Sequence, residues 1–392
     1  MTKILLPAFL IGVLTLLGAE SPSSSEPHIV AQQDFRSEKE IEVRLVSSAP
    51  DGSIWLLVEN EPYETHRSRR DFELWRLDSD SKRTVDLRLE DFTPNWFDEA
   101  YAMAAERDGS VAITFRSENR NLTLLVIGKD GRVLIRKILD SDHPGDQIMS
   151  LRVASDSFLT AVRYSDGKPS LVKIRPDGET LFKQTLNDSE TGGLLDALRT
   201  ETGELVATTR VMQGKKLQLA VEKIVPDGTV RAKVTLPDAF TLVPPALCLD
   251  RHDHGFAVVY ETIDIPNKGW NVTVEWFDQS LSPKGKASFF HNGIVPTRVA
   301  ALPDERGNVL IGTIDGMARM KLVWLAPTGR VAKTMDVPAA KSTTSPYAAY
   351  DFNKYLVEQP QGFAAIVRSK IVTQDTNGKT AGTWAIRVMK VQ

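Results

Sequence analysis

The residues best suited to metal chemistry lie in the stretch "CLDRHDHGFAVVYE", where Asp250, His252, Asp253 and His254 fall within five positions, two residues after Cys248. Imidazole, carboxylate and thiolate groups bind transition metals, but a site needs three or four of them converging at fixed distances. Side chains on a short polar turn point outward into water instead. We therefore interpret the stretch as a strand, a surface turn and a strand, with Cys248 as a buried apolar residue, and predict no metal site.

A second set of residues combines carboxylates with aromatic rings, the groups that bind sugars, peptides or cations. Its members are Trp96, Asp98, Glu99, His143, Asp146, Tyr347 and Asp351. They come from three separate variable segments, so they form one site only if the fold brings these segments together. The alternative is ordinary solvated loop charge, with Trp96 packed inside the fold. Arg67, Arg69 and Arg70 form a basic patch that suits an anionic ligand or a solvated loop.

No motif of a known reaction is present in the sequence. There is no glycine-rich phosphate loop, no nucleophile elbow and no His-Glu-x-x-His helix. The 48 basic and 51 acidic residues give a formal charge of −3, which argues against a nucleic-acid partner. We predict no catalytic residue.

The elements that must position these residues form an internal repeat. A short polar turn followed by an apolar strand occurs seven times, as in "APDGSIWLLVE", "ERDGSVAITFR" and "DERGNVLIGTI". Within each interval a second pair of strands flanks another turn, as in "SLVKIRPDGETLFKQTL". Pro-Asp-Gly between two alternating runs indicates a β-hairpin, because proline presets φ, aspartate bonds its own backbone and glycine adopts a positive φ. A spacing of roughly 40 to 50 residues is typical of propeller blades.

The repeat predicts an all-β fold, a seven-bladed β-propeller of four-stranded antiparallel blades. The last repeat lacks its fourth strand at the C-terminus, and "PHIVAQQDF" at 27–35 precedes the first repeat. We expect this N-terminal strand to close the last blade. The alternative is a leader that joins no sheet.

Several repeats resemble those of known propellers. "DGSIWLLVENE" followed by "FELWRLDSDSKRTVDLRL" resembles an NHL-type blade, and "IRPDGETLFKQTL" and "LAPTGRVAKTMDV" are similar to hairpins of PQQ-like propellers. The resemblance spans nearly the whole chain after the N-terminal segment, but its motifs are general to propellers. It implies a fold and no particular activity.

The predicted fold assigns the candidates to one face. The short stereotyped turns share one face of a propeller, and the variable B–C loops and D–A crossings share the other, which carries all seven candidate residues. We expect a non-enzymatic propeller that binds a protein or carbohydrate there, without a cofactor. The alternative is a hydrolase or lyase with an acidic, calcium-dependent site at the channel mouth. A third reading is a structural envelope subunit that docks through its rim.

The N-terminus is typical of an export signal. Lys3 precedes the apolar run 4–17, which ends at Gly18 and Ala19, and this run is shorter than the ~20 residues that span a bilayer. We predict a signal peptide at 1–19, a Ser/Pro linker at 20–27 and one propeller domain at 28–392. The expected protein is secreted or periplasmic, has no membrane span after cleavage and is a monomer without an internal disulfide.

Overall fold

The computed structural model is built from strands that follow the repeat. It describes residues 26–60, 71–89, 101–116, 122–140, 147–153, 158–163, 169–185, 194–200, 204–225, 229–237, 239, 245–250, 254–264, 269–291, 300–304, 306–314, 320–337, 356–374 and 380–392. Within these ranges there are 28 strands and no helix. Accordingly, this part of the chain has no helix long and apolar enough to cross a membrane.

The strands form seven four-stranded antiparallel sheets, which we number in chain order by their innermost strands. Sheet 1 contains β2 (Ile41–Ser48), β3 (Ile54–Asn60), β4 (Asp71–Leu77) and β5 (Arg83–Arg88). Sheet 2 contains β6 (Tyr101–Ala105), β7 (Val111–Arg116), β8 (Leu122–Ile127) and β9 (Val133–Asp140). Sheet 3 contains β10 (Gln147–Val153), β11 (Phe158–Arg163), β12 (Pro169–Ile174) and β13 (Thr180–Thr185). Sheet 4 contains β14 (Leu194–Arg199), β15 (Leu205–Gln213), β16 (Lys216–Ile224) and β17 (Val230–Leu236).

The remaining sheets complete the series. Sheet 5 contains β18 (Ala246–Leu249), β19 (Phe256–Asp264), β20 (Gly269–Phe277) and β21 (Pro283–His291). Sheet 6 contains β22 (Ala300–Pro303), β23 (Val309–Ile314), β24 (Met320–Leu325) and β25 (Val331–Asp336). Sheet 7 contains β26 (Leu356–Glu358), β27 (Phe363–Gln374) and β28 (Thr380–Val391), with β1 (Ile29–Ser37) antiparallel to β28 as its outermost strand.

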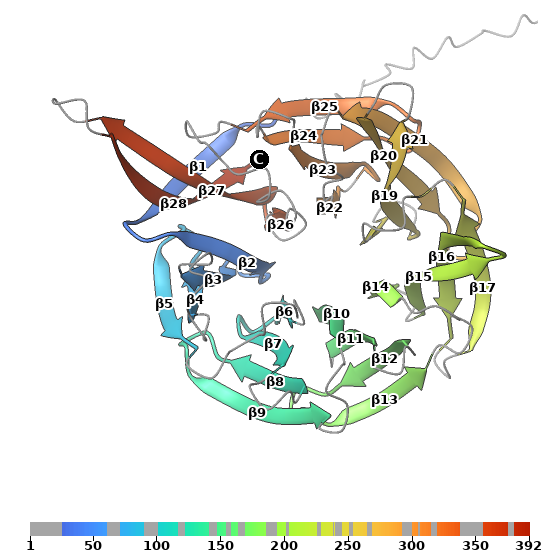
Figure 1. Ribbon diagram of the computed structural model, residues 1–392, viewed down its shortest axis with the longest axis horizontal. Coiled ribbons are helices and arrows are strands. Elements are labelled where there is room, and N and C mark those ends of the chain that lie inside the picture. The colour runs from blue at the N-terminus through green and yellow to red at the C-terminus, as the bar shows by residue number, and fades with distance from the viewer. Residues whose placement is uncertain are drawn as a thin grey trace, which may run out of the picture.

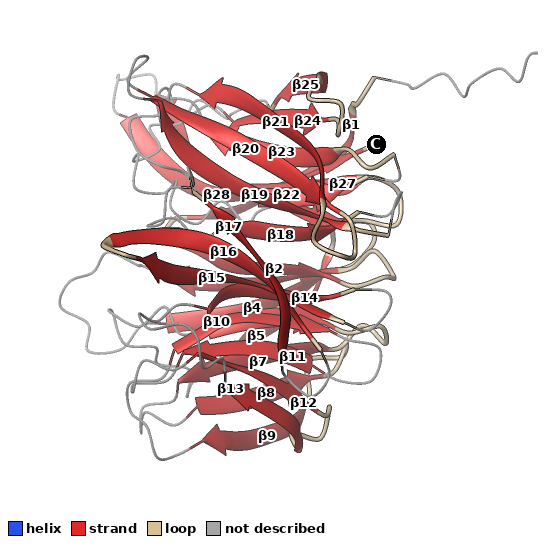
Figure 2. Ribbon diagram, turned by 90° about the vertical axis from the view of Figure 1, so that its right-hand side faces the viewer, coloured by secondary structure: helices blue, strands red, loops and turns tan. Residues whose placement is uncertain are grey.

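The innermost strands contact one another around a central axis (Figure 1). The contacts run from β2 through β6, β10, β14, β18, β22 and β26 back to β2. Most of the described short turns gather on one face of the disc, and the short β15–β16 turn lies on the other (Figure 2). The prediction of an all-β propeller of four-stranded antiparallel sheets is confirmed at this level.

The core lies between adjacent sheets. Strand side chains alternate between the two faces of a sheet, and both faces are covered by neighbours, so the strands carry near-continuous apolar runs. Leu57 of sheet 1 packs with Ile113 of sheet 2, and Val274 of sheet 5 packs with Ile311 of sheet 6. Several outermost strands carry a lysine, a residue that protects an unpaired edge from adding another strand. The examples are Lys137, Lys183, Lys233, Lys286 and Lys333.

Two turns of sheet 5 take a left-handed conformation without glycine. In the β20–β21 turn Leu281 has φ 68°, and Gly285 lies inside β21. In the β18–β19 turn, His254 has φ 55°. This turn joins a strand to a strand, as predicted for "CLDRHDHG", and Cys248 is buried in β18.

Candidate functional site

A groove of about 590 Å³ separates the outermost strand of sheet 7 from the outer half of sheet 1. Its walls are β1 and the chain that follows it on one side, and β4 and β5 on the other. The β1–β2 connection and the end of β3 border it, which places it on the B–C/D–A face. Pockets of about 300–1,000 Å³ are the usual size for small-molecule sites.

Trp75 of β4 is the aromatic centre of the groove. The ring of Phe35, from β1, lies with its centroid 5.9 Å from the indole at 52°, and the Arg83 guanidinium carbon lies 4.5 Å from the indole centroid. Trp75 is only 5% exposed. Two side chains from different sheets thus hold the indole in one orientation, in addition to the interactions of its own strand.

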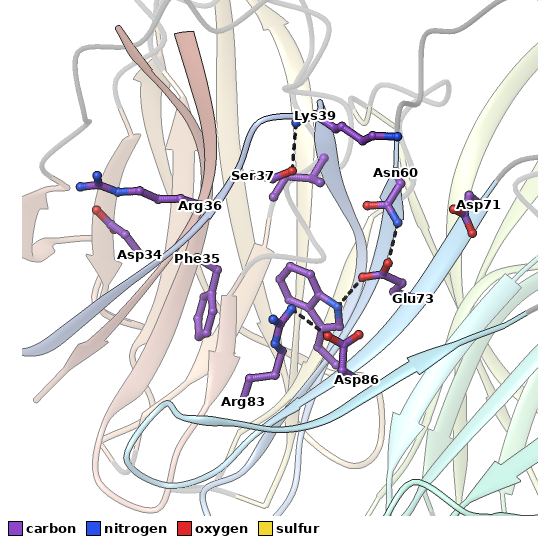
Figure 3. Close-up of a pocket in the computed structure, with 12 residues that line it drawn as sticks. Asp34, Phe35, Arg36, Ser37, Lys39, Asn60, Asp71, Glu73, Arg83 and Asp86 are labelled. Atoms are coloured by element: carbon purple, nitrogen blue, oxygen red, sulfur yellow. Dashed lines mark hydrogen bonds and ion pairs between the residues drawn. The ribbon is translucent and has the colours of Figure 1, made fainter. Parts of the chain in front are cut away.

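The carboxylate of Glu73 is fixed by two donors. The Trp75 indole N–H donates to Oε2 at 2.8 Å, and the Asn60 side-chain amide donates to Oε1 at 2.9 Å (Figure 3). A carboxylate offers about four lone-pair directions, so Glu73 keeps acceptor capacity after both bonds. Its orientation is set before any ligand arrives, which lowers the cost of binding.

Charged pairs surround this centre. Arg83 pairs with Asp86 at 3.1 Å, and Arg88 donates to Asp71 at 3.0 Å. Lys39 lies at the groove edge, where its backbone N–H donates to the Ser37 hydroxyl at 3.2 Å. The wall therefore alternates acceptors and donors around an aromatic floor.

Asp34 and Arg36 lie on the other side of β1 from Phe35 (Figure 3). Asp34 accepts two hydrogen bonds from Arg387 of β28, at 2.7 and 2.8 Å. These bonds hold the pKa of the Asp34 carboxyl below its usual range, against the opposing effect of burial. This ion pair fastens β1, and hence one wall of the groove, to sheet 7.

A buried ionic network lies at the inner end of the same two sheets. Arg44 of β2 donates to Glu59 at 2.5 Å and to Glu42 at 3.1 Å. Arg368 of sheet 7 pairs with Glu40 and stacks 4.1 Å from the Trp384 ring centroid. Buried charges persist only when paired, so this network joins the sheets electrostatically.

All seven residues predicted as ligand-binding lie outside the described residues, as do Arg67, Arg69 and Arg70. Whether they form one site therefore stays a prediction. Of the His/Asp stretch, Asp250 and His254 are described, and His252 and Asp253 are not. The described residues contain no group of three or more His, Cys, Asp or Glu side chains arranged to hold a metal ion.

Sequence reasoning missed Trp75 and Glu73 because they alternate with apolar residues as in any strand. The strand register supplies the missing signal. In each sheet, the first residue of the second strand pairs with an apolar residue near the end of the third strand. In sheet 1 this pair is Ile54 and Leu77, and Trp75 lies two positions before Leu77. The other six sheets carry Leu125, Val172, Glu222, Glu275, Val323 and Met389 there. The indole is thus a departure from the repeat.

Comparison with known proteins shows the fold and no more. No family model and no curated protein matches the sequence. The chain is similar to a crystal structure of puromycin hydrolase, with a TM-score of 0.55, 13% identity, and coverage of 87% of this chain and 53% of that one. It therefore spans about half the length of puromycin hydrolase.

Two further solved structures cover most of both chains. The WD40 domain of Toxoplasma gondii coronin gives a TM-score of 0.51 at 10% identity, covering 94% of this chain and 88% of that one. The BP39L lectin of Burkholderia pseudomallei gives 0.51 at 9% identity, covering 89% and 97%. Enzymes, lectins and WD40 domains share this fold, so the β-propeller architecture does not by itself select a function.

Proposed function

We propose that the protein is a non-enzymatic binding propeller whose groove between sheets 7 and 1 takes a carbohydrate. The observation that carries this proposal is the fixed Glu73 carboxylate beside the held indole of Trp75, at a position where the other sheets have no aromatic ring. Rigid aromatic surface with a few pre-oriented polar groups is the usual composition of a ligand site.

The polar groups suit a sugar rather than an ion. A sugar hydroxyl both donates and accepts, and the groove presents acceptors on Glu73, Asp71 and Asp86 together with donors on Lys39 and Arg83. Acids and bases alternate along the wall, so no single sign of charge dominates. A neutral, hydroxyl-rich ligand satisfies such a wall without leaving a buried charge unpaired.

No residue of the groove is assigned a catalytic role. Asp71 and Asp86 each pair with an arginine, and Glu73 accepts from two N–H donors. The proposal uses all three carboxylates as hydrogen-bond acceptors for a ligand.

We further infer that the pairing of β1 with β28 closes the seven sheets into a ring, and that the protein is exported. The first inference is supported by the register from Ile29 opposite Val391 to Ser37 opposite Trp384. The second is supported by the apolar N-terminal run that follows Lys3 and ends at Gly18 and Ala19. The NHL- or PQQ-like affiliation remains an inference from the hairpin sequences.

A glycan array followed by calorimetry tests the proposed function. Wild-type protein should bind a defined set of glycans, and Glu73→Gln should weaken binding at least about tenfold, because one N–H donor then faces an amide NH₂. Glu275→Gln is the matched control. It alters a third-strand carboxylate of sheet 5 that accepts from the Tyr260 hydroxyl at 2.9 Å and is remote from the groove. Equal loss in both variants, or no glycan bound by the wild type, would reject the proposal.

A further inference from the structure

A second cavity, of about 510 Å³, lies between sheets 6 and 7 on the face of the short turns. Its apolar floor includes Leu302, Leu310, Trp324 and Phe363, and the indole and the phenyl ring meet edge to face at 5.8 Å. This cavity is opposite in face and distinct in lining from the carbohydrate groove. It therefore needs its own explanation.

The indole N–H of Trp324 has no hydrogen-bond partner among the described residues, although Trp324 is 8% exposed and lines the cavity. Its counterparts are satisfied across the sheet interfaces. Trp276 donates to the Gly307 carbonyl of the next sheet at 3.0 Å, and Trp55 donates to Gly109 at 3.1 Å. Buried indole N–H groups usually have a partner.

The comparison with Trp276 is close because the two indoles occupy the same register. Trp276 is paired with Gly285 on the outer strand of sheet 5, and Trp324 is paired with Lys333 on the outer strand of sheet 6. A Cβ on Gly285 would lie 2.3 Å from the Pro327 carbonyl oxygen, so glycine permits sheets 5 and 6 to approach closely. In sheet 6 the corresponding position is held by Lys333, whose side chain lines the cavity.

The next turn also differs. The β26–β27 turn is one residue shorter than the β22–β23 turn, and Gly362, whose carbonyl accepts from the Gln359 backbone N–H at 3.1 Å, corresponds to Asn308, whose carbonyl accepts from Asp304. The position of Gly307, two residues before the second strand, is therefore held by Gln361 in sheet 7. Trp324 is left with a donor and an open cavity in place of a partner.

Three side-chain amides that line the cavity donate to neighbouring groups of the chain. Asn308 donates to Asp304 at 2.7 Å, Gln359 to the Glu358 carbonyl at 3.0 Å, and Gln392 to Gln361 at 3.0 Å. Each amide retains its carbonyl oxygen as an acceptor. The cavity thus combines the Trp324 donor and the amide acceptors with an apolar floor, and Asp304, Arg306, Lys333 and Glu358 also line it.

We infer that this cavity binds an extended peptide segment of a partner protein. One backbone carbonyl of the segment accepts from the Trp324 indole, as Gly307 does from Trp276, its N–H groups donate to the lining amides, and an apolar side chain lies on Trp324 and Phe363. A peptide is the ligand whose repeating unit supplies both a carbonyl and an N–H beside an apolar group.

The test uses N-acetyl-leucine N-methylamide as a probe and the indole N–H resonances of the full chain as the readout. The Trp324 resonance is the one missing from the spectrum of Trp324→Phe. We expect it to shift saturably with a Kd of about a millimolar, the range for a ligand of this size. Trp324→Phe should weaken binding roughly tenfold, measured on other cavity resonances.

The control variant is Trp276→Phe, which removes an indole N–H that the protein itself uses. It should leave the probe affinity unchanged while lowering the melting temperature, whereas Trp324→Phe should leave the melting temperature nearly unchanged. No shift of the Trp324 resonance up to about 20 mM probe, or an equal shift with toluene, which has no amide, would overturn the proposal. Concentration-dependent self-association that Trp324→Phe abolishes would also overturn it, by identifying a second copy of the chain as the occupant.

Discussion

The attachment of β1 to sheet 7 gives the sharpest prediction for stability. Asp34→Asn removes the charge from a pair of hydrogen bonds to Arg387, of 2.7 and 2.8 Å, between side chains that are 20% and 12% exposed. A fully buried pair would cost several kcal/mol to break, and an exposed one almost nothing. For this partly buried, two-bond geometry we expect a loss of about 1–2 kcal/mol.

Thermal unfolding followed by circular dichroism measures this loss. For a chain of this size we expect the melting temperature to fall by about 2–4 °C near neutral pH. Asp71→Asn is the matched control, because it lies in the same region but pairs with Arg88, whose side chain is 66% exposed. Its expected effect is under about 0.5 kcal/mol.

The pH dependence has a definite sign. The folded-state pKa of Asp34 lies below its unfolded value, because Arg387 donates to the carboxylate. The stabilisation is therefore fully present above the unfolded pKa of about 3.9 and is lost as the pH falls through the lower folded value. The difference between wild type and Asp34→Asn should stay constant from about pH 7 to pH 5 and shrink below about pH 4. Equal melting temperatures at neutral pH, or an equal drop for Asp71→Asn, would refute the reasoning.

Three further predictions concern turns and interfaces. Burial, and after it the nearby Asp108, raises the pKa of Glu106. Ionisation of Glu106 therefore destabilises the fold as the pH rises through the pKa of the folded state. Glu106→Gln should raise the melting temperature near pH 7 and leave it unchanged near pH 4. Gly285→Ala should lower the free energy of unfolding, measured by chemical denaturation, by more than about 2 kcal/mol, because the added Cβ would meet the Pro327 backbone. Gly214→Ala is the control: its Cβ would have nothing within 4 Å, so only the strain of its φ of 63° should count, about 1 kcal/mol. Trp276→Phe should lower the melting temperature more than Trp324→Phe, and equal drops would contradict the unmatched donor described above.

The fold was predictable because its signal repeats. Each short turn before an apolar strand marks the same point in a sheet, so a departure in one copy, such as Leu281 in place of a glycine before β21, does not disturb the others. The left-handed φ of Leu281 shows that the turn is imposed by the two strands it joins, even where glycine is absent.

The candidate sites were less predictable because they depend on register and on distant pairing. Phe35 and Trp75 are 40 positions apart in sequence. Their rings meet because β1 is the outermost strand of sheet 7 and Trp75 lies on β4 of the adjacent sheet 1. The variable segments drew attention because binding residues concentrate on loops. An alignment of the third strands by register would have singled out Trp75, and the pairing of Gly285 with Trp276 would have singled out Trp324.

The central claim is that the groove between sheets 7 and 1 is the carbohydrate site, and indole NMR tests it most directly. Wild-type protein would be titrated with a glycan selected on the array, and the Trp75 resonance identified by its absence in Trp75→Phe. The account predicts that the Trp75 N–H, which donates to Glu73, shifts saturably while those of Trp55 and Trp276 stay in place. Saturable binding that leaves the Trp75 resonance unmoved would contradict it.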